Sequence, residues 1–218
     1  EKARFRVAVF KQKGNAAMVC RLIPNKLLTF EQIGLPHKVV ELLDRPRGLL
    51  LVTGPAGSGK TTTVYAGLRE LSESAEEGRS LVSIEDPIEA VIKGVAQSQV
   101  QPTAGFTYEA GLRSLLRQDP DVILVGEIRD STTAELVFQA ALSGHLVLST
   151  YHAGSAAGAM QRLVDMGIEP YQLRSGLLAV LSQRLLRRLC ECAVETTSPS
   201  QLLGLEITAA RKPAGCPS

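Results

Sequence analysis

The middle of the chain alternates short apolar runs with longer amphipathic segments. Residues 48–53 read Gly-Leu-Leu-Leu-Val-Thr, which is typical of a strand buried on both faces of a parallel sheet. Similar runs predict strands at residues 79–84, 121–125 and 146–150, and residues 91–100 are β-like and punctuated by glycine. Apolar residues at helical spacing predict helices at residues 37–44, 61–72, 108–118, 132–142, 155–166 and 170–189. Strands that alternate with helices predict an α/β fold, a three-layer sandwich on a mostly parallel sheet.

The last of these predicted helices is the longest. Leu173, Leu177, Leu181 and Leu185 recur at helical spacing, and the arginines of this segment fall mostly off that stripe. The pattern therefore predicts one continuous amphipathic helix over residues 170–189.

The first 24 residues have a different pattern. Phe5, Val7 and Val9 alternate with Arg and Ala, and residues 16–23 can return as a second strand after a polar turn. Because an isolated hairpin is only marginally stable, we expect it to end an N-terminal α+β domain that begins outside this sequence. The expected organisation is a hairpin at residues 1–24, a linker at 25–36, a core at 37–189 and a partial cysteine-containing lobe at 190–218.

The composition is that of an ordinary globular protein, with 44% hydrophobic and 21% charged residues among 218. The formal net charge is +2 and only 4% of residues are aromatic, so neither charge nor stacking side chains favour a nucleic-acid partner. No apolar stretch approaches membrane-spanning length, and no signal peptide is visible. The four cysteines do not suggest a secreted disulfide scaffold, so we expect a cytoplasmic protein without a transmembrane segment.

Residues 54–61 carry the most specific chemistry. They read Gly-Pro-Ala-Gly-Ser-Gly-Lys-Thr, the G-x-x-x-x-G-K-[ST] pattern of a P-loop, between a predicted strand and a predicted helix. The glycines let backbone N–H groups surround phosphate oxygens, Lys60 supplies a positive charge, and the Thr61 hydroxyl can ligate Mg²⁺. The following helix presents its positive dipole end to the same anion. The predicted nucleotide-binding residues of this segment are Gly54, Pro55, Ala56, Gly57, Ser58, Gly59, Lys60, Thr61 and Thr62.

Two acidic residues follow predicted strands. Glu127 ends Val-Ile-Leu-Val-Gly-Glu, a Walker B layout, and is the expected metal-side carboxylate, acting partly through water. Glu85 follows another buried strand, where a carboxylate can reach the γ-phosphate region as general base. Since ligands of such sheets bind beyond the carboxyl ends of strands, the P-loop, both acids and the residues after Thr150 should share one edge. The alternatives are a surface acid at Glu127 and an ordinary Glu-Asp-Pro turn at Glu85.

His145 and His152 flank the predicted strand at residues 146–150. Each can donate a hydrogen bond to phosphate or hold a catalytic carboxylate, although a lone histidine is more often structural. Because they stand at opposite ends of one strand, at most one should touch nucleotide directly. His152 is the better candidate, and His145 is expected to couple the site to a neighbouring segment.

Four motifs in this order resemble one family. The segments GPAGSGKTTT, SIEDPIE, LRQDPDVILVGEIRD and SGHLVLSTYH are similar to the Walker A, Asp box, Walker B and His box of the type II secretion and type IV pilus motor ATPases, the GspE/PilB/PilT group. The resemblance runs from about Phe5 to Cys216. It implies a RecA-like P-loop NTPase that uses ATP and Mg²⁺.

The same resemblance implies a setting for that activity. Its members are cytoplasmic homo-hexamers, peripheral at the inner face of the bacterial inner membrane, that dock on inner-membrane platform proteins. Hydrolysis of ATP then drives cyclic domain motion that powers type II protein secretion or type IV pilus assembly.

The resemblance also assigns roles to residues. Glu85 matches the family's water-activating glutamate, Glu127 the Walker B glutamate, and His145 and His152 the His-box pair. Ala90 stands where an aromatic residue commonly follows the Asp box, and Tyr151 and Ala153 replace the usual Leu and Thr around the second histidine. Neither difference removes a chemical group that hydrolysis needs.

Arginines are the remaining site candidates. Arg6 and Arg21, on the hairpin, match arginines that the family brings to the phosphates from a mobile N-terminal domain. Arg117 and Arg129 are weaker candidates. The alternative for each is an ordinary solvated or salt-bridged side chain.

The C-terminal cysteines resemble the start of the tetracysteine zinc lobe of the secretion and pilus-extension branches. That lobe has two C-x-x-C pairs, whereas Cys190 and Cys192 form only C-x-C, Cys216 matches the third cysteine, and the fourth would fall just past the end of this sequence. A closed structural zinc site needs four ligands, so we expect no zinc site formed by these residues alone, and only the full-length protein could complete one. The alternative is that the three cysteines bind nothing. Cys20, on the hairpin, is interpreted as a buried small apolar residue.

Two other functions stay open at this point. A RecA-like nucleic-acid motor shares the P-loop and sheet but needs a basic or aromatic track. A nucleotide-binding paralogue without motor activity is disfavoured because Lys60, Glu85 and Glu127 are all present. Within the family, residues 162–190 and the cysteines look more like the secretion or pilus-extension branch. The sequence names neither the platform partner nor the transported substrate.

Overall fold

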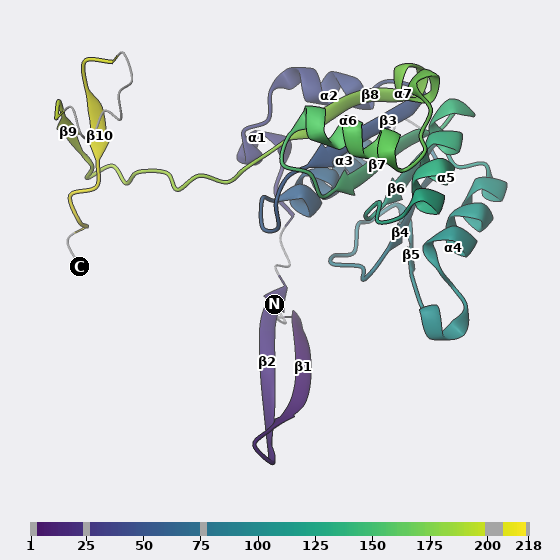
Figure 1. Cartoon of the computed structure of the whole chain (residues 1–218), viewed down its shortest axis with the longest axis horizontal. Coiled ribbons are helices and arrows are strands. Elements are labelled where there is room, and N and C mark those ends of the chain that lie inside the picture. Colours follow the sequence, from purple (N-terminus) through teal and green to yellow (C-terminus); the bar gives the residue numbers. More distant parts are fainter. Residues whose placement is uncertain (1–3, 24–26, 75–77, 199–206, 217–218) are drawn as a thin grey trace. The chain divides into compact units, whose positions relative to one another are not determined.

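Six strands of the described residues pair in one sheet, in the order β5-β4-β6-β7-β3-β8, and every neighbouring pair is parallel. The computed structural model describes residues 4–23, 27–74, 78–198 and 207–216 (Figure 1). The bounds of the strands are β3 Gly48–Thr53, β4 Leu81–Glu85, β5 Val95–Gln99, β6 Val122–Val125, β7 Leu146–Tyr151 and β8 Leu177–Ser182.

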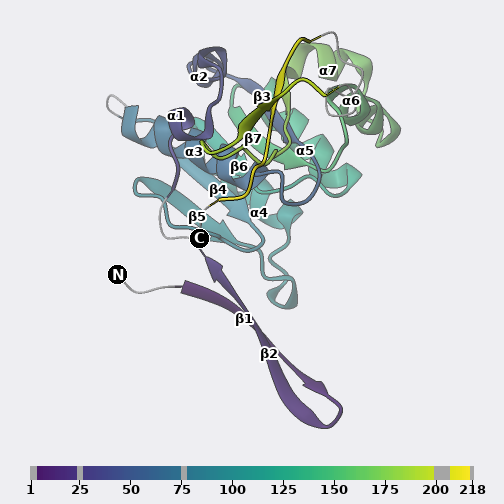
Figure 2. The ribbon, with the colours of Figure 1, turned by 90° about the vertical axis from the view of Figure 1, so that its left-hand side faces the viewer.

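Helices cover both faces of this sheet (Figures 1 and 2). Leu49 and Leu51 of β3 pack with one buried cluster, while Leu50 and Val52 pack with the other, because successive strand residues point to opposite faces. The first cluster contains residues of α4 Tyr108–Leu115, α5 Ser131–Leu142, α6 Ala156–Asp165 and α7 Pro170–Gly176. The second contains residues of α1 Phe30–Ile33, α2 His37–Leu43 and α3 Lys60–Ser74. The three-layer α/β sandwich expected from the sequence is confirmed.

Side-chain caps fix where several helices begin. The side chains of Thr107, Asp130 and Ser155 accept hydrogen bonds from backbone N–H groups in the first turns of α4, α5 and α6. Helix α3 begins directly at Lys60, at the end of the P-loop. Two short 3₁₀ helices, Pro102–Ala104 and Leu116–Gln118, lie outside the buried core.

The single helix predicted over residues 170–189 is wrong. Helix α7 ends at Gly176, residues 177–182 form β8, and residues 183–189 have no regular structure. The run Leu-Leu-Ala-Val-Leu-Ser pairs in parallel with β3, opposite residues 49–53. That pairing satisfies the backbone hydrogen-bonding groups along one side of β3. The prediction failed because the periodicity of apolar residues alone cannot distinguish a short apolar strand from a helix. Gly176 also suits the crowded helix end, because a Cβ there would lie 3.2 Å from Phe138.

The N-terminal residues form the predicted hairpin. Strands β1 Arg4–Gln12 and β2 Asn15–Ile23 are antiparallel, and Lys13 and Gly14 turn between them with φ of 51° and 81°. Within the described residues these two strands pair only with each other. Cys20 is therefore exposed, and its interpretation as a buried residue is wrong.

The chain divides into two compact units, residues 1–184 and 185–218. In the second unit, β9 Val194–Thr196 and β10 Ala210–Lys212 form a small antiparallel pair. In the ranges that the structure describes, no helix is both long and apolar enough to cross a membrane.

Phe138 tests the packing of the central helix α5. Its side chain is fully buried, so Phe138→Ala should lower the free energy of unfolding by about 3–5 kcal/mol, measured by urea denaturation. Val91→Ala is the control, because Val91 is 77% exposed and should change stability by about 0.5 kcal/mol or less. Equal effects of the two substitutions would contradict the position of α5 in the core.

Candidate active site

The carboxyl ends of β4, β6 and β7 and the P-loop after β3 border one cavity of about 300 Å³. The structure thus brings residues from distant parts of the chain to one edge of the sheet, where the sequence places a ligand. The charged and titratable residues that line it, together with Thr61, are Arg6, Lys60, Tyr65, Glu85, Asp86, Glu89, Tyr108, Glu127, Arg129 and His152.

The P-loop needs glycine at several positions for physical reasons. Gly57 and Gly59 have φ of 74° and 86°, which side chains other than glycine rarely adopt. A Cβ on Gly54 would lie 2.4 Å from the carbonyl oxygen of Gln183 and 2.5 Å from Ser58 Oγ. Position 54 therefore has no room for a side chain, because the loop packs closely on Ser58 and on the segment after β8.

Lys60 is held inside this loop. Its side chain is largely buried, and Nζ donates to the carbonyl oxygens of Gly54 and Pro55, at 3.0 Å each. Burial lowers the pKa of the Lys60 ammonium, and the nearby Glu127 carboxylate opposes that shift. The ammonium is thus kept close to the loop that would surround phosphate.

Glu85 is the most buried acid of the cavity, with only 3% of its surface exposed. It accepts hydrogen bonds from the hydroxyls of Tyr65 and Ser83 and, at 3.1 Å, from the amide of Gln97. Burial and contact with Glu85 raise the pKa of Tyr65, so the phenol stays protonated and able to donate. Since a carboxylate offers about four lone-pair sites, three donors leave one for a water molecule.

Glu127 lies in a chain of charged groups. Arg129 Nε donates to Glu127 Oε2 at 2.7 Å, and its Nη1 lies 3.3 Å from Asp86 Oδ2. The hydrogen bond to Glu127 raises the pKa of the Arg129 guanidinium. His152 Nε2 lies 2.9 Å from Glu127 Oε1, and His152 Nδ1 lies 3.4 Å from Lys60 Nζ. His152 therefore bridges Lys60 and Glu127.

His145 lies at the opposite end of β7. Its Nδ1 is 3.0 Å from the carbonyl oxygen of Ala140 and 3.2 Å from Ser143 Oγ, beyond the end of α5. The six residues of β7 separate the two histidines by about 20 Å of extended chain. The structure does not bring His145 to the cavity, and Arg117, on the second 3₁₀ helix, is not part of its lining.

The hairpin arginines are paired across the two strands. Arg6 and Arg21 stand directly opposite each other in the β1–β2 register, so both side chains share one face of the hairpin. Arg6 lines the cavity of about 300 Å³ that also holds Lys60, Glu85 and Glu127. Both arginines line an adjoining cavity of about 180 Å³ beside Pro87 and Glu89.

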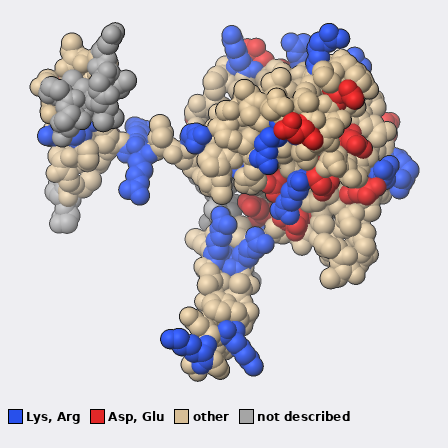
Figure 3. Space-filling view, viewed as in Figure 1, with Lys and Arg blue, Asp and Glu red and all other residues tan. Residues whose placement is uncertain are grey.

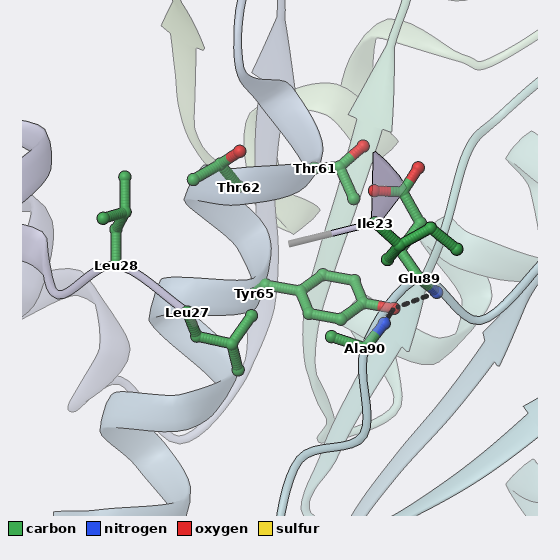
Figure 4. Close-up of a pocket in the computed structure, with 8 residues that line it drawn as sticks. All are labelled: Ile23, Leu27, Leu28, Thr61, Thr62, Tyr65, Glu89 and Ala90. Atoms are coloured by element: carbon green, nitrogen blue, oxygen red, sulfur yellow. Dashed lines mark hydrogen bonds between the residues drawn. The ribbon is translucent and has the colours of Figure 1, made fainter. Parts of the chain in front are cut away.

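A third cavity, of about 250 Å³, adjoins the start of α3. Figure 4 shows Tyr65 crossing it, with the hydroxyl turned to the backbone N–H of Glu89, which donates to it at 3.0 Å. Leu27 and Leu28 form an apolar wall, and Thr61 and Thr62 lie on the helix opposite (Figure 4).

The sequence alone missed two residues of this region. Tyr65 falls among the apolar positions of the predicted helix, and the signal in the sequence was its hydroxyl, which needs a hydrogen-bond partner when the ring is buried. Gln183 donates to the carbonyl oxygen of Ser58 at 2.7 Å, but it fell within the helix wrongly predicted over residues 170–189.

The second unit gathers three cysteines. The sulfur atoms of Cys190, Cys192 and Cys216 all lie within 4.8 Å of one another. Hydrogen bonds from Cys192 lower the pKa of the Cys190 thiol, which favours the thiolate that binds metal. Three sulfur atoms this close fit a shared metal ion, although a tetrahedral zinc site takes a fourth ligand.

A P-loop at the end of an interior strand, with carboxylates at the same ends of other parallel strands of the sheet, defines a P-loop nucleotide-binding protein. A sequence model of the family described as type II/IV secretion system protein matches residues 1–218, and the chain belongs to that family. The resemblance found in the motifs is confirmed.

Individual relatives agree with this assignment. The type II secretion system ATPase E of Vibrio cholerae serotype O1 is 57% identical over 68% of this chain and 29% of its own length. The type II secretion system protein E of Pectobacterium carotovorum subsp. carotovorum is 45% identical over 97% of this chain. The chain spans only 44% of that relative's length.

A solved structure supports the fold. The crystal structure of the pilus retraction motor PilT with bound ADP has a TM-score of 0.75 and 40% sequence identity. The match covers 84% of this chain and 55% of PilT. The expected RecA-like fold is confirmed.

Tyr65→Phe tests the buried hydrogen bonds of Glu85. The substitution removes one donor to a buried carboxylate and leaves the N–H of Glu89 without its acceptor. We expect the free energy of unfolding to fall by about 1–3 kcal/mol in urea denaturation. Tyr171→Phe is the matched control, because Tyr171 is 60% exposed. A loss no larger than that of the control would contradict the hydroxyl's role.

Proposed function

We propose that this chain is the catalytic part of an ATP-hydrolysing motor subunit of a type II secretion or type IV pilus machine. One observation carries the proposal: Lys60, Glu85 and Glu127 line a single cavity at the edge of the sheet. Such a set supplies the three needs of phosphoryl transfer, which are phosphate binding, water activation and a metal-side carboxylate. Membership of the secretion family supports the same activity.

The triphosphate would lie over the P-loop. Lys60 can exchange the carbonyl oxygens of Gly54 and Pro55 for β- and γ-phosphate oxygens, while glycine-rich backbone N–H groups surround the anion. Thr61 and Glu127 offer the oxygen ligands that Mg²⁺ prefers, so the residues present fit a magnesium ion held partly through water. When bound, that ion neutralises charge on the phosphates.

The base of the nucleotide would occupy the third cavity. Leu27 and Leu28 give it an apolar wall, and Thr61 and Thr62 join it to the P-loop at the start of α3. A cavity with an apolar wall next to a phosphate-binding loop suits a purine ring. In this proposal the whole of ATP would lie along the N-terminal end of α3.

Hydrolysis would use Glu85 as general base. Water attacks the γ-phosphorus, its proton passes to the Glu85 carboxylate, and the bond from the γ-phosphorus to the β,γ-bridging oxygen breaks to give ADP and phosphate. Tyr65, Ser83 and Gln97 hold the carboxylate in place for this step. His152 contacts both Lys60 and Glu127, so binding of the γ-phosphate at His152 would affect both of these side chains.

The hairpin arginines would bind the same phosphates. Two like charges directly opposite on a hairpin repel each other, and an anion between them removes that cost. Because Arg6 already lines the cavity, hydrolysis at the P-loop would be coupled to the domain that carries the hairpin. We also propose that His145, which precedes β7, couples the site to a neighbouring segment.

The motor setting follows from the family. We propose a homo-hexamer at the cytoplasmic face of the inner membrane, docked on platform proteins, whose domains move with each ATP cycle. A nucleic-acid motor is the other candidate. On the face of the core seen in Figure 3, basic and acidic side chains are interspersed, which does not favour a strand of nucleic acid. Stimulation of hydrolysis by DNA would favour that candidate instead.

Glu85→Gln and Lys60→Ala test the catalytic assignment in the full-length protein. Loss of a general base should lower phosphate release by about 10²–10⁴-fold in Glu85→Gln while MgATP still binds. Lys60→Ala should lose both binding and hydrolysis, because it removes the charge facing the phosphates. Glu109→Gln, on the exposed surface of α4, is the control and should behave as wild type. Unchanged release in both test variants would contradict the proposed site.

Zinc would bind the cysteine cluster in the full-length protein. Three thiolates on the second unit need one more ligand from outside them to close a tetrahedral site. Elemental analysis of the full-length protein should find about one zinc per chain, lost in Cys216→Ser and kept in Cys20→Ser, because Cys20 is not one of the clustered cysteines. Absence of zinc from the wild type would show that the cluster serves no metal.

A further inference from the structure

We propose that Gln183 is a positioning residue that sets the shape of the P-loop for nucleotide. The proposal rests on the function proposed above, because it concerns how tightly that loop binds the phosphates of ATP. Gln183 follows β8 directly and lies beside the loop, in a segment that the sequence pattern predicts as helix.

Three hydrogen bonds tie Gln183 to successive parts of the loop region. Its backbone N–H donates to the carbonyl oxygen of Thr53 at 2.9 Å, where the loop begins. Its amide Nε2 donates to the carbonyl oxygen of Ser58 at 2.7 Å, and its Oε1 accepts from the Thr63 hydroxyl at 2.9 Å. One side chain therefore joins the top of the loop to the first turn of α3.

The bond to Ser58 has a direct consequence for phosphate binding. A peptide unit is planar and trans, so its C=O and N–H groups point in opposite directions. Holding the Ser58 carbonyl toward Gln183 turns the N–H of Gly59 away from Gln183. Gly59 precedes Lys60, at the position where P-loops use backbone N–H groups to bind phosphate. Without the amide, this peptide can rotate, because Gly59 restricts its own backbone little.

Close packing makes the arrangement specific. The carbonyl oxygen of Gln183 lies where a Cβ on Gly54 would come within 2.4 Å. The next residue, Arg184, donates to the carbonyl oxygen of Gly154 at 2.9 Å, shortly after His152. The first compact unit ends at Arg184, so its last two residues, Gln183 and Arg184, are the ones that contact the P-loop and the segment after β7.

Steady-state kinetics of the full-length protein test the inference. In Gln183→Ala, KM for MgATP should rise about tenfold, the effect expected for one or two lost hydrogen bonds. The value of kcat at saturation should stay within about threefold of wild type, because the contacts of Glu85 and Glu127 are untouched. Gln161→Ala is the matched control, since Gln161 is exposed on α6 and bonds only to Asp165 among the described contacts.

The Thr63 bond gives a second, independent readout. Thr63→Val removes the partner of Gln183 Oε1, so Thr63→Val and Gln183→Ala together should raise KM by less than the product of the two single effects. The inference would be overturned if KM in Gln183→Ala were unchanged. A fall in kcat at unchanged KM would also overturn it, because that result indicates only that a smaller fraction of the protein is folded. Lys60→Ala is measured alongside: if its KM and kcat also match wild type, the proposed function fails, and this inference with it.

Discussion

The site depends on the parallel pairing of β3 with both β7 and β8. Since parallel strands end at the same edge, this pairing places the P-loop between two segments: His152 after β7 and Gln183 after β8. The Thr53 hydroxyl donates to the carbonyl oxygen of Ala153 and accepts from its N–H, at 3.1 Å each, which fixes the β7 side. Gln183 fixes the β8 side through Thr53 and Ser58. The loop is therefore held from both neighbouring strands before any ligand contributes.

Burial separates the tasks of the two acids. Glu85 is enclosed and receives three side-chain donors, so its carboxylate keeps one orientation. Glu127 is more open and shares its oxygens with Arg129 and His152, partners that a metal or a phosphate group can replace. A fixed acid suits the activation of water, whereas an exchangeable one suits a metal-side ligand. The environment of each carboxylate, more than its residue type, thus supports the roles proposed for the pair.

Much of the fold could be predicted because its strands are continuous apolar runs, and such runs have few alternatives. The P-loop, Glu85, Glu127 and His152 could be placed at one edge because they follow those strands. Residues 177–182 could not be predicted: their leucines satisfy helical spacing, and only pairing with β3 makes them a strand. Because residues 170–189 were predicted as one helix, the position of Gln183 beside the P-loop could not be foreseen. The contact of Arg129 with Glu127 and Asp86 was also out of reach, because it joins the ends of two strands.

The most direct test of the account is a crystal structure of the full-length protein with Mg²⁺ and a non-hydrolysable ATP analogue. The account predicts phosphates over residues 54–61, with Lys60 Nζ moved from the carbonyl oxygens of Gly54 and Pro55 to phosphate oxygens. It also predicts Glu85 facing the γ-phosphate and Gln183 still bonded to Ser58. A nucleotide bound elsewhere, or Lys60 still on those carbonyls beside a bound triphosphate, would contradict it.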